Sequence, residues 1–176
     1  MRLAVSIAAA MLSVAPAMAA LAPGAKAPLF KAKGAAAGKP YDVDLGAALK
    51  KGPVVLYFFP AAFTPGCNAE AHGFAEAAGD FAAAGATVIG MTAGNVDQLA
   101  KFSSEKCAGK FPVAAAAPDV VKAYDVVLKG ATGYTSRTSY VITPDGKVFY
   151  AHDDLNPADH IRNTLDAVRR YRAAYR

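Results

Sequence analysis

The feature that most constrains the fold is a continuous apolar run that a proline ends. Residues 54–59 have the sequence Val-Val-Leu-Tyr-Phe-Phe, which contains no polar side chain except one tyrosine hydroxyl and is rich in residues that favour strands. An uninterrupted apolar run of this length is typical of a strand that is buried on both faces of a sheet. Pro60 has no N–H to continue the strand, so the run ends there. The sequence therefore predicts a buried central strand with a loop and a helix after it.

The segments around this run predict alternating strands and helices. The other expected strands are residues 87–91, a short extended piece at 111–113, 138–142, 147–150, and weak edge strands within 21–50. The expected helices are residues 65–84, 95–108, 118–124 and 157–175. Gly34 and Gly38 indicate turns between the weak edge strands.

This order of elements predicts an α/β fold. Helical crossovers imply parallel pairing of the first strands, and Pro144-Asp145-Gly146 indicates a hairpin that adds an antiparallel edge. We therefore expect a thioredoxin-like sandwich, in which helices flank a mixed central β-sheet. A flavodoxin-like sheet is the second alternative, but it would need more parallel units.

Composition excludes several classes of protein. The chain has 176 residues, of which 54% are hydrophobic and 19% charged, so one domain can fill its core without a disulfide framework. The net charge is +5, and the one arginine-rich stretch, within 169–176, is expected at a helix end, where cations suit the helix dipole. We therefore expect no nucleic-acid partner.

The first 19 residues have the order typical of a cleaved secretory signal. Arg2 precedes an apolar stretch over residues 3–14, and Ala-Met-Ala at 17–19 is a suitable cleavage site. The apolar stretch is too short to span a bilayer, although an uncleaved N-terminal anchor remains the alternative. We expect residues 1–19 to be removed and residues 20–176 to form a single domain that is periplasmic or secreted, without stable membrane association.

The segment between the central strand and the next helix carries the strongest chemical signal. Thr64 precedes a proline, which disfavours helical geometry, and it is expected at the N-cap. Pro65 suits the first helical position, so Gly66 and Cys67 follow with backbone N–H groups that have no partner inside the helix. These donors and the positive end of the helix dipole favour the thiolate of Cys67, which is the nucleophilic form.

Position and residue type alone leave a second interpretation open. On a helical wheel Cys67 shares an apolar face with Glu70 and Phe74, so it could be a buried cysteine that acts as a small hydrophobic residue. Glu70 could likewise be an ordinary helix charge. Unpaired carboxylates seldom point inward, however, and this favours a specific role for Glu70.

The string Pro60-x-x-x-Thr64-x-x-Cys67, followed by Glu70, resembles the active-site signature of the peroxiredoxins, the AhpC/TSA superfamily. The similarity extends from about Leu21 to Tyr171. Arg137 lies where that family has a second active-site arginine. Residues 157–160, followed by a helix, resemble the ending of the bacterioferritin-comigratory (PrxQ) branch.

The resemblance implies a role for each matching residue. Cys67 would be the peroxidatic thiolate, Thr64 would hydrogen-bond the peroxide, and Pro60 would shield the site from water. Arg137 would favour ionisation of Cys67 and stabilise charge on the departing oxygen, and Glu70 would hold Arg137 in place. Without the resemblance, Arg137 could be a solvated residue at a strand end.

The resemblance also implies thiol peroxidase activity in which Cys67 becomes a sulfenic acid. The branch often has its resolving cysteine five residues after the first, but here that residue is His72, which the helical wheel places on the far side from Cys67. Cys107, at the end of the next expected helix, is the remaining candidate, and we expect it to be partly buried and to form a disulfide with Cys67. The alternative is a passive core cysteine, with direct reduction of Cys67 by an external thiol.

The expected partners are a peroxide and an exported thioredoxin-like or small-thiol reductant, and the chain is expected to be a monomer or weak dimer. His72, His152 and His160 are scattered in the sequence and C-x-x-C is absent, so we expect no metal and no cofactor. The rival functions are an exported thiol–disulfide oxidoreductase, a peroxide sensor, and a structural module with a Cys67–Cys107 disulfide. The oxidoreductase would be expected to carry C-x-x-C.

Overall fold

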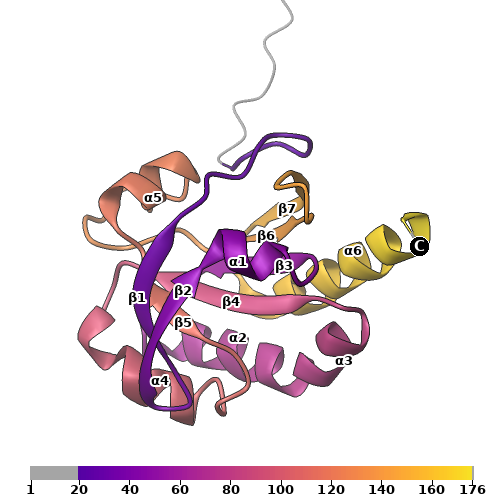
Figure 1. The fold of residues 1–176 in the computed structure, drawn as a ribbon. Helices are drawn as coiled ribbons and strands as arrows, with labels where there is room; N and C mark the ends of the chain where they lie inside the picture. The colour runs from indigo at the N-terminus through magenta and orange to yellow at the C-terminus, as the bar shows by residue number, and fades with distance from the viewer. Residues whose placement is uncertain (1–19, 176) are drawn as a thin grey trace, which may run out of the picture.

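The computed structural model describes residues 20–175, which form a seven-stranded mixed sheet between two layers of helices (Figure 1). The strands are β1 Lys31–Ala36, β2 Lys39–Asp44, β3 Val54–Phe58, β4 Thr87–Thr92, β5 Val113–Ala115, β6 Thr138–Ile142 and β7 Val148–Asp153. The helices are α1 Leu45–Leu49, α2 Pro65–Glu76, α3 Ala78–Ala83, α4 Leu99–Glu105, α5 Pro118–Ala123 and α6 His160–Ala174, with 3-10 turns η1 Val96–Gln98 and η2 Pro157–Asp159.

Strand β3 lies near the middle of the sheet, whose order is β2-β1-β5-β4-β3-β6-β7. It pairs in parallel with β4 and antiparallel with β6, and β6 continues into the β7 hairpin. The predicted thioredoxin-like architecture, the parallel first pair and the antiparallel hairpin edge are therefore confirmed.

The alternation of side chains along β3 joins both layers to the sheet. Val55, Tyr57 and Phe59 enter the core beneath α2, α3, α4 and α6, whereas residues 54, 56 and 58 enter the core beneath α1 and α5. Figure 1 shows these two helical layers on opposite sides of the sheet. Since every residue of β3 is fully buried, neither face can accept a polar side chain without cost.

Several boundaries differ from the prediction. The helix expected at 65–84 is interrupted at Ala77, and the one expected at 95–108 is a 3-10 turn followed by a seven-residue helix. Helix α1 was not predicted. Gly38, with φ of +79°, does form the β1–β2 turn, but the prediction of a turn at Gly34 is wrong. A Cβ on Gly34 would lie 2.1 Å from the carbonyl oxygen of Val113, so glycine is needed there because β1 approaches β5 closely.

The expected signal segment, residues 1–19, lies outside the described residues. Among the helices of residues 20–175, none combines the length and apolar character required to cross a membrane.

Candidate active site

The site begins in the loop that leaves β3, and polar side chains fix the backbone of this loop. The side chains of Thr135, Thr92 and Asn95 donate to the carbonyl oxygens of Phe59, Pro60 and Ala62 at 2.6, 3.0 and 2.8 Å. Phe63 has a φ of +63°, a left-handed conformation that is strained for a residue other than glycine. The surrounding hydrogen bonds therefore hold the loop in a shape that it would not adopt alone.

Helix α2 begins directly after this loop, as predicted. Thr64 occupies the N-cap position with extended backbone angles, and Pro65 is the first helical residue. The Thr64 hydroxyl does not cap the helix, however, because it donates to the carbonyl oxygen of Ala61 at 3.3 Å. The prediction that Thr64 is the N-cap residue is therefore confirmed for the backbone, and its half-buried side chain bonds to the loop instead of the helix.

Cys67 lies in the first turn of α2, and only 1% of its surface is exposed. The Nη2 atom of Arg137 lies 3.5 Å from its Sγ atom, within hydrogen-bonding distance for sulfur. The other guanidinium nitrogens are also occupied, since Nη1 donates to Oε2 of Glu70 and Nε donates to the carbonyl oxygen of Leu155 at 2.8 Å. The structure therefore brings Cys67, Glu70 and Arg137 together, although they come from two elements distant in the sequence.

Burial decides the electrostatics of this group. Arg137 is 5% exposed and Glu70 is 1% exposed, so the alternative of a solvated arginine at a strand end is wrong. Burial raises the pKa of Glu70, although the charge of Arg137 acts in the opposite direction. The guanidinium of Arg137 therefore places a buried positive charge directly beside Sγ of Cys67.

Gly66 contributes to the site through its missing side chain, which the sequence analysis did not predict. A Cβ on this residue would lie 3.1 Å from Nη2 of Arg137, closer than ordinary van der Waals contact. The missing side chain therefore leaves room for the guanidinium to reach Cys67. The only sequence signal was its place immediately before the cysteine.

His160 also joins the site and was not predicted as a site residue. It is the first residue of α6, is fully buried, and lies with Nδ1 at 3.6 Å from Oε1 of Glu70. The same nitrogen is 2.8 Å from Oγ of Ser139, and Nε2 is 2.8 Å from the carbonyl oxygen of Asp154. Burial lowers the pKa of His160 to about 4, so the ring is neutral near pH 7.

Cys107 lies in the turn that follows α4, not at the end of a helix, and it is fully buried where partial burial was predicted. Both cysteines are free thiols. Burial raises the pKa of Cys107 to about 12, and the neighbouring Tyr57 hydroxyl opposes this only in part. Cys107 is therefore an unreactive thiol in this conformation.

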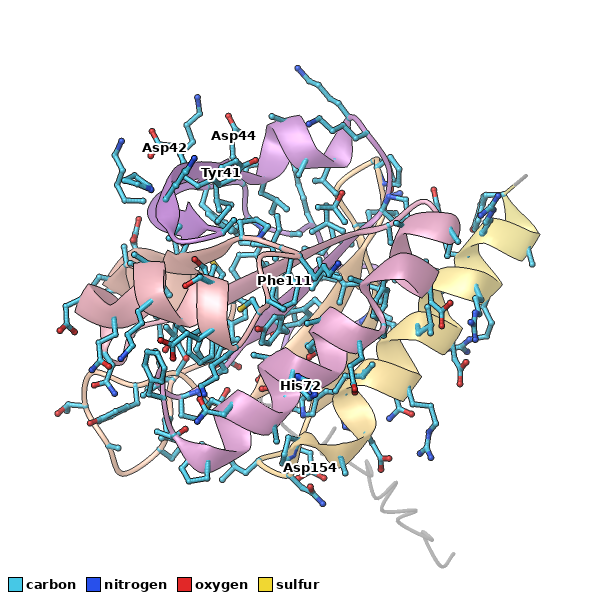
Figure 2. All side chains as sticks on the ribbon, turned by 90° about the horizontal axis from the view of Figure 1, so that it is seen from below. Tyr41, Asp42, Asp44, His72, Phe111 and Asp154 are labelled. Carbon is cyan, nitrogen blue, oxygen red and sulfur yellow. The ribbon has the colours of Figure 1, made fainter. Side chains whose placement is uncertain are left out.

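His72 lies away from the site, as predicted. It is an exposed residue of α2 that pairs with Glu76 at 3.4 Å, and Figure 2 places it on the outer side of the helix layer. Within residues 20–175, no group of three or more His, Cys, Asp or Glu side chains is arranged to hold a metal ion.

The sequence model of the AhpC/TSA family matches residues 23–151, which include the loop, Cys67, Glu70, Cys107 and Arg137. The chain belongs to the AhpC/TSA family. A Mycobacterium tuberculosis relative whose name places it among the peroxiredoxins is 38% identical over 107 residues, covering 59% of this chain and 69% of the relative.

Solved structures agree with this family. The crystal structure of the peroxidoxin BcpB from Mycobacterium tuberculosis superimposes with a TM-score of 0.74 at 30% identity, covering 88% of this chain and 97% of BcpB. The bacterioferritin comigratory protein of Xanthomonas campestris gives 0.68 at 25% identity, over 80% of this chain and 91% of that protein. The chain is thus an enzyme of the peroxiredoxin class, the thiol-dependent peroxidases, and is similar to the Bcp and PrxQ proteins.

The buried, neutral His160 predicts a specific sensitivity to acid. The folded-state pKa is below the unfolded value of about 6.5, so its contribution to stability is present above pH 6.5 and is lost as the pH falls through about 4. The free energy of unfolding of the wild type, relative to that of His160→Gln, should therefore fall by roughly 3 kcal/mol across this range. Urea unfolding at a series of pH values measures the difference. His72→Gln is the control at an exposed site, and its free energy of unfolding should follow the wild-type dependence on pH. A difference between wild type and His160→Gln that stays constant across the pH range would contradict the prediction.

Proposed function

We propose that this peroxiredoxin reduces hydrogen peroxide and organic hydroperoxides through a sulfenic acid on Cys67, which Cys107 then resolves as a disulfide. The contact of Arg137 with Sγ of Cys67 at 3.5 Å is the observation that carries the proposal. It puts a buried positive charge beside a sulfur that already lies in the first turn of a helix. Both features favour the thiolate, which is the nucleophile of the first step.

In this step the Cys67 thiolate attacks one oxygen of the peroxide. An S–O bond forms as the O–O bond breaks, so sulfur is oxidised to the sulfenic acid and the peroxide is reduced to water or an alcohol after the departing oxygen takes a proton. We assign Arg137 to stabilise the charge on that oxygen. Glu70 and Leu155 support this assignment because they fix the guanidinium on its other two sides.

Thr64 and Pro60 complete the proposed substrate site. The Thr64 hydroxyl can both donate to and accept from a peroxide, and its weak 3.3 Å bond to Ala61 can be exchanged at little cost. Pro60 is half-buried in the loop that leaves β3, and Thr92 fixes its carbonyl group. We propose that Pro60 keeps water from the thiolate.

The sulfenic acid is resolved when the sulfur of Cys107 attacks Sγ of Cys67, which forms the disulfide and releases water. Since Cys107 is fully buried and held as a thiol, its turn must first open. Two features of this turn favour opening. Ala108 has a strained φ of +48°, and α4 before it has only seven residues.

The β1–β2 hairpin restrains this opening. The buried hydroxyl of Ser103 in α4 accepts a hydrogen bond from the backbone N–H of Gly38 at 2.9 Å. The backbone N–H of Gly109 in turn donates to the Ser103 carbonyl group at 2.9 Å. Ser103 therefore links the Cys107 turn to the tip of the hairpin.

Organic hydroperoxides are included because apolar side chains adjoin the site. Phe63 is partly buried in the loop, Leu155 is 61% exposed next to Arg137, and Tyr134 is 42% exposed against Gly94. The bacterioferritin comigratory protein of Xanthomonas campestris has alkyl peroxide reduction activity. A thioredoxin-like or small-thiol reductant would return the disulfide to two thiols, and we propose that the chain acts as a monomer or weak dimer.

A peroxide sensor would share the first chemical step and differ in the partner that receives the oxidation. A thiol–disulfide oxidoreductase is less well supported, because the two cysteines are 40 positions apart in the sequence.

Replacement of each cysteine tests the two steps separately. Cys67→Ser should fold and lose all peroxide reduction, since no sulfenic acid can form. Cys107→Ser should reduce one equivalent of peroxide at the wild-type rate and then stop with Cys67 oxidised. Stopped-flow peroxide consumption and mass spectrometry of the quenched protein measure both outcomes. Turnover by Cys67→Ser would contradict the function, and wild-type protein oxidised at Cys67 with Cys107 still free would contradict the disulfide alone.

Ser103→Ala should accelerate formation of the Cys67–Cys107 disulfide after oxidation. The substitution removes the contact with Gly38 that restrains the turn, and we expect an increase of roughly threefold to tenfold, which corresponds to about 1 kcal/mol for one hydrogen bond. Rapid alkylation of free thiols at successive times after one equivalent of peroxide gives the rate. Ser104→Ala is the matched control, since the exposed Ser104 hydroxyl bonds only to carbonyls of its own helix. An equal rate in wild type and Ser103→Ala would show that the contact does not limit resolution.

We also propose that the protein is exported and works in the periplasm or outside the cell. The charged start, the apolar stretch and the Ala-Met-Ala site of residues 1–19 support this proposal. The mature chain isolated from cells should begin at Ala20. N-terminal sequencing together with cell fractionation tests this, and an intact Met1 on a cytosolic protein would refute it.

A further inference from the structure

We propose that His160 is a positioning residue for peroxide reduction, because it holds both groups that orient the Arg137 guanidinium toward Cys67. The inference rests on the proposed function, since it concerns the same thiolate. It adds a residue that lies 93 positions from Cys67 in the sequence and that does not contact the sulfur in the structure.

The first link runs through the loop between β7 and η2. Nε2 of His160 lies 2.8 Å from the carbonyl oxygen of Asp154, and the next carbonyl, that of Leu155, accepts from Nε of Arg137 at 2.8 Å. The backbone N–H of Asp154 also donates to the carbonyl oxygen of Arg137 at 3.2 Å. In Figure 2 Asp154 lies at the end of the molecule where α6 begins. His160 therefore fixes the short exposed loop that supplies one anchor of the guanidinium.

The second link runs through Glu70. A carbonyl oxygen can only accept, so Nε2 of the neutral ring must carry the proton and donate to Asp154. Nδ1 is then an acceptor, and it takes the hydroxyl proton of Ser139 at 2.8 Å. Oε1 of Glu70 faces this nitrogen at 3.6 Å and has no hydrogen-bond partner among residues 20–175.

The imidazole ring of His160 therefore limits the movement of the Glu70 carboxyl group by occupying the space behind it. Ser139 fixes one edge of the imidazole and Asp154 the other, so the ring cannot turn aside. Glu70 in turn cannot swing away from Arg137 without entering the space that the ring fills. Its Oε2 atom stays on Nη1 of Arg137 for this reason, although Oε1 gains no hydrogen bond from the arrangement.

The His160 ring is surrounded by charged and titratable groups from each of the elements that pack against it. Glu70 faces it from α2, Arg137 lies behind Glu70 immediately before β6, and His152 of β7 packs edge-to-face with its ring centroid at 4.5 Å. Asp154 contributes its backbone carbonyl group. His152 packs against the ring and makes no hydrogen bond or ion pair to Glu70 or Arg137, which makes it the natural control.

The experiment compares three substitutions at position 160. His160→Asn can keep a polar atom near the position of Nδ1, His160→Gln can keep one near Nε2, and His160→Phe keeps only the ring. We expect the rate constant for the first peroxide turnover to fall roughly tenfold or more in His160→Phe and less in the other two. The pH at which this rate reaches half its maximum should rise in all three, because a mobile guanidinium stabilises the thiolate less.

His152→Phe is the control and should leave the rate and the pH profile unchanged. A purely structural role for His160 predicts lower thermal stability with the wild-type pH profile, and that result would overturn the proposal. If His160→Phe does not fold, His160→Asn and His160→Gln decide in the same way. Should Cys67→Ser still reduce peroxide, the proposed function fails; an inactive Cys67→Ser beside unaltered His160 variants removes only the positioning role.

Discussion

The site depends on one guanidinium that is almost completely removed from water. A buried charge is costly unless its hydrogen-bond donors are used, and Arg137 uses Nε, Nη1 and Nη2 on three different groups. Those groups belong to α2 and to the loop after β7, so the arginine joins two sides of the molecule at Cys67. Because burial of this charge is costly, the loss or displacement of any one partner of Arg137 would leave a donor unpaired away from water.

The two cysteines have the same side chain but lie in different surroundings, and we expect their reactivity to differ for that reason. Cys67 lies at a helix start beside a positive charge, and both features favour ionisation. Cys107 lies in the apolar core with a raised pKa, which keeps it a thiol. In the proposed cycle the first cysteine is ready before peroxide arrives, whereas the second becomes available only when a turn opens.

The scaffold supplies rigidity where the chemistry needs it and weakness where movement is required. Strand β3 is buried along its whole length, and its loop is anchored by donors from β4, the residues after it and the approach to β6. The Cys107 turn, by contrast, contains a strained alanine and follows a helix of seven residues. Local stability is therefore higher in the loop before Cys67 than in the turn that holds Cys107, and the proposed disulfide step requires only that turn to open.

Local features of the sequence were sufficient to predict the buried strand, the helix start at Pro65, the inward direction of Cys67 and the mixed sheet, because each depends on periodicity or on the backbone limits of proline. Family resemblance added Arg137 and Glu70 as candidates. The same reasoning missed the space that Gly66 leaves for Arg137 and missed His160. It also predicted a turn at Gly34, which lies inside β1, and partial burial of Cys107, which is fully buried.

What a sequence determines alone is the conformation that neighbouring residues impose on one another, and this was enough for the buried strand, the β1–β2 turn at Gly38 and the helix start that places Cys67 in its first turn. Only the tertiary structure decided which side chains meet. The place of Gly34 follows from the approach of β1 to β5, and the contacts of His160 follow from the packing of α6 beside β6 and β7. Such contacts join residues that are far apart in the sequence, and no local rule of spacing or propensity encodes them.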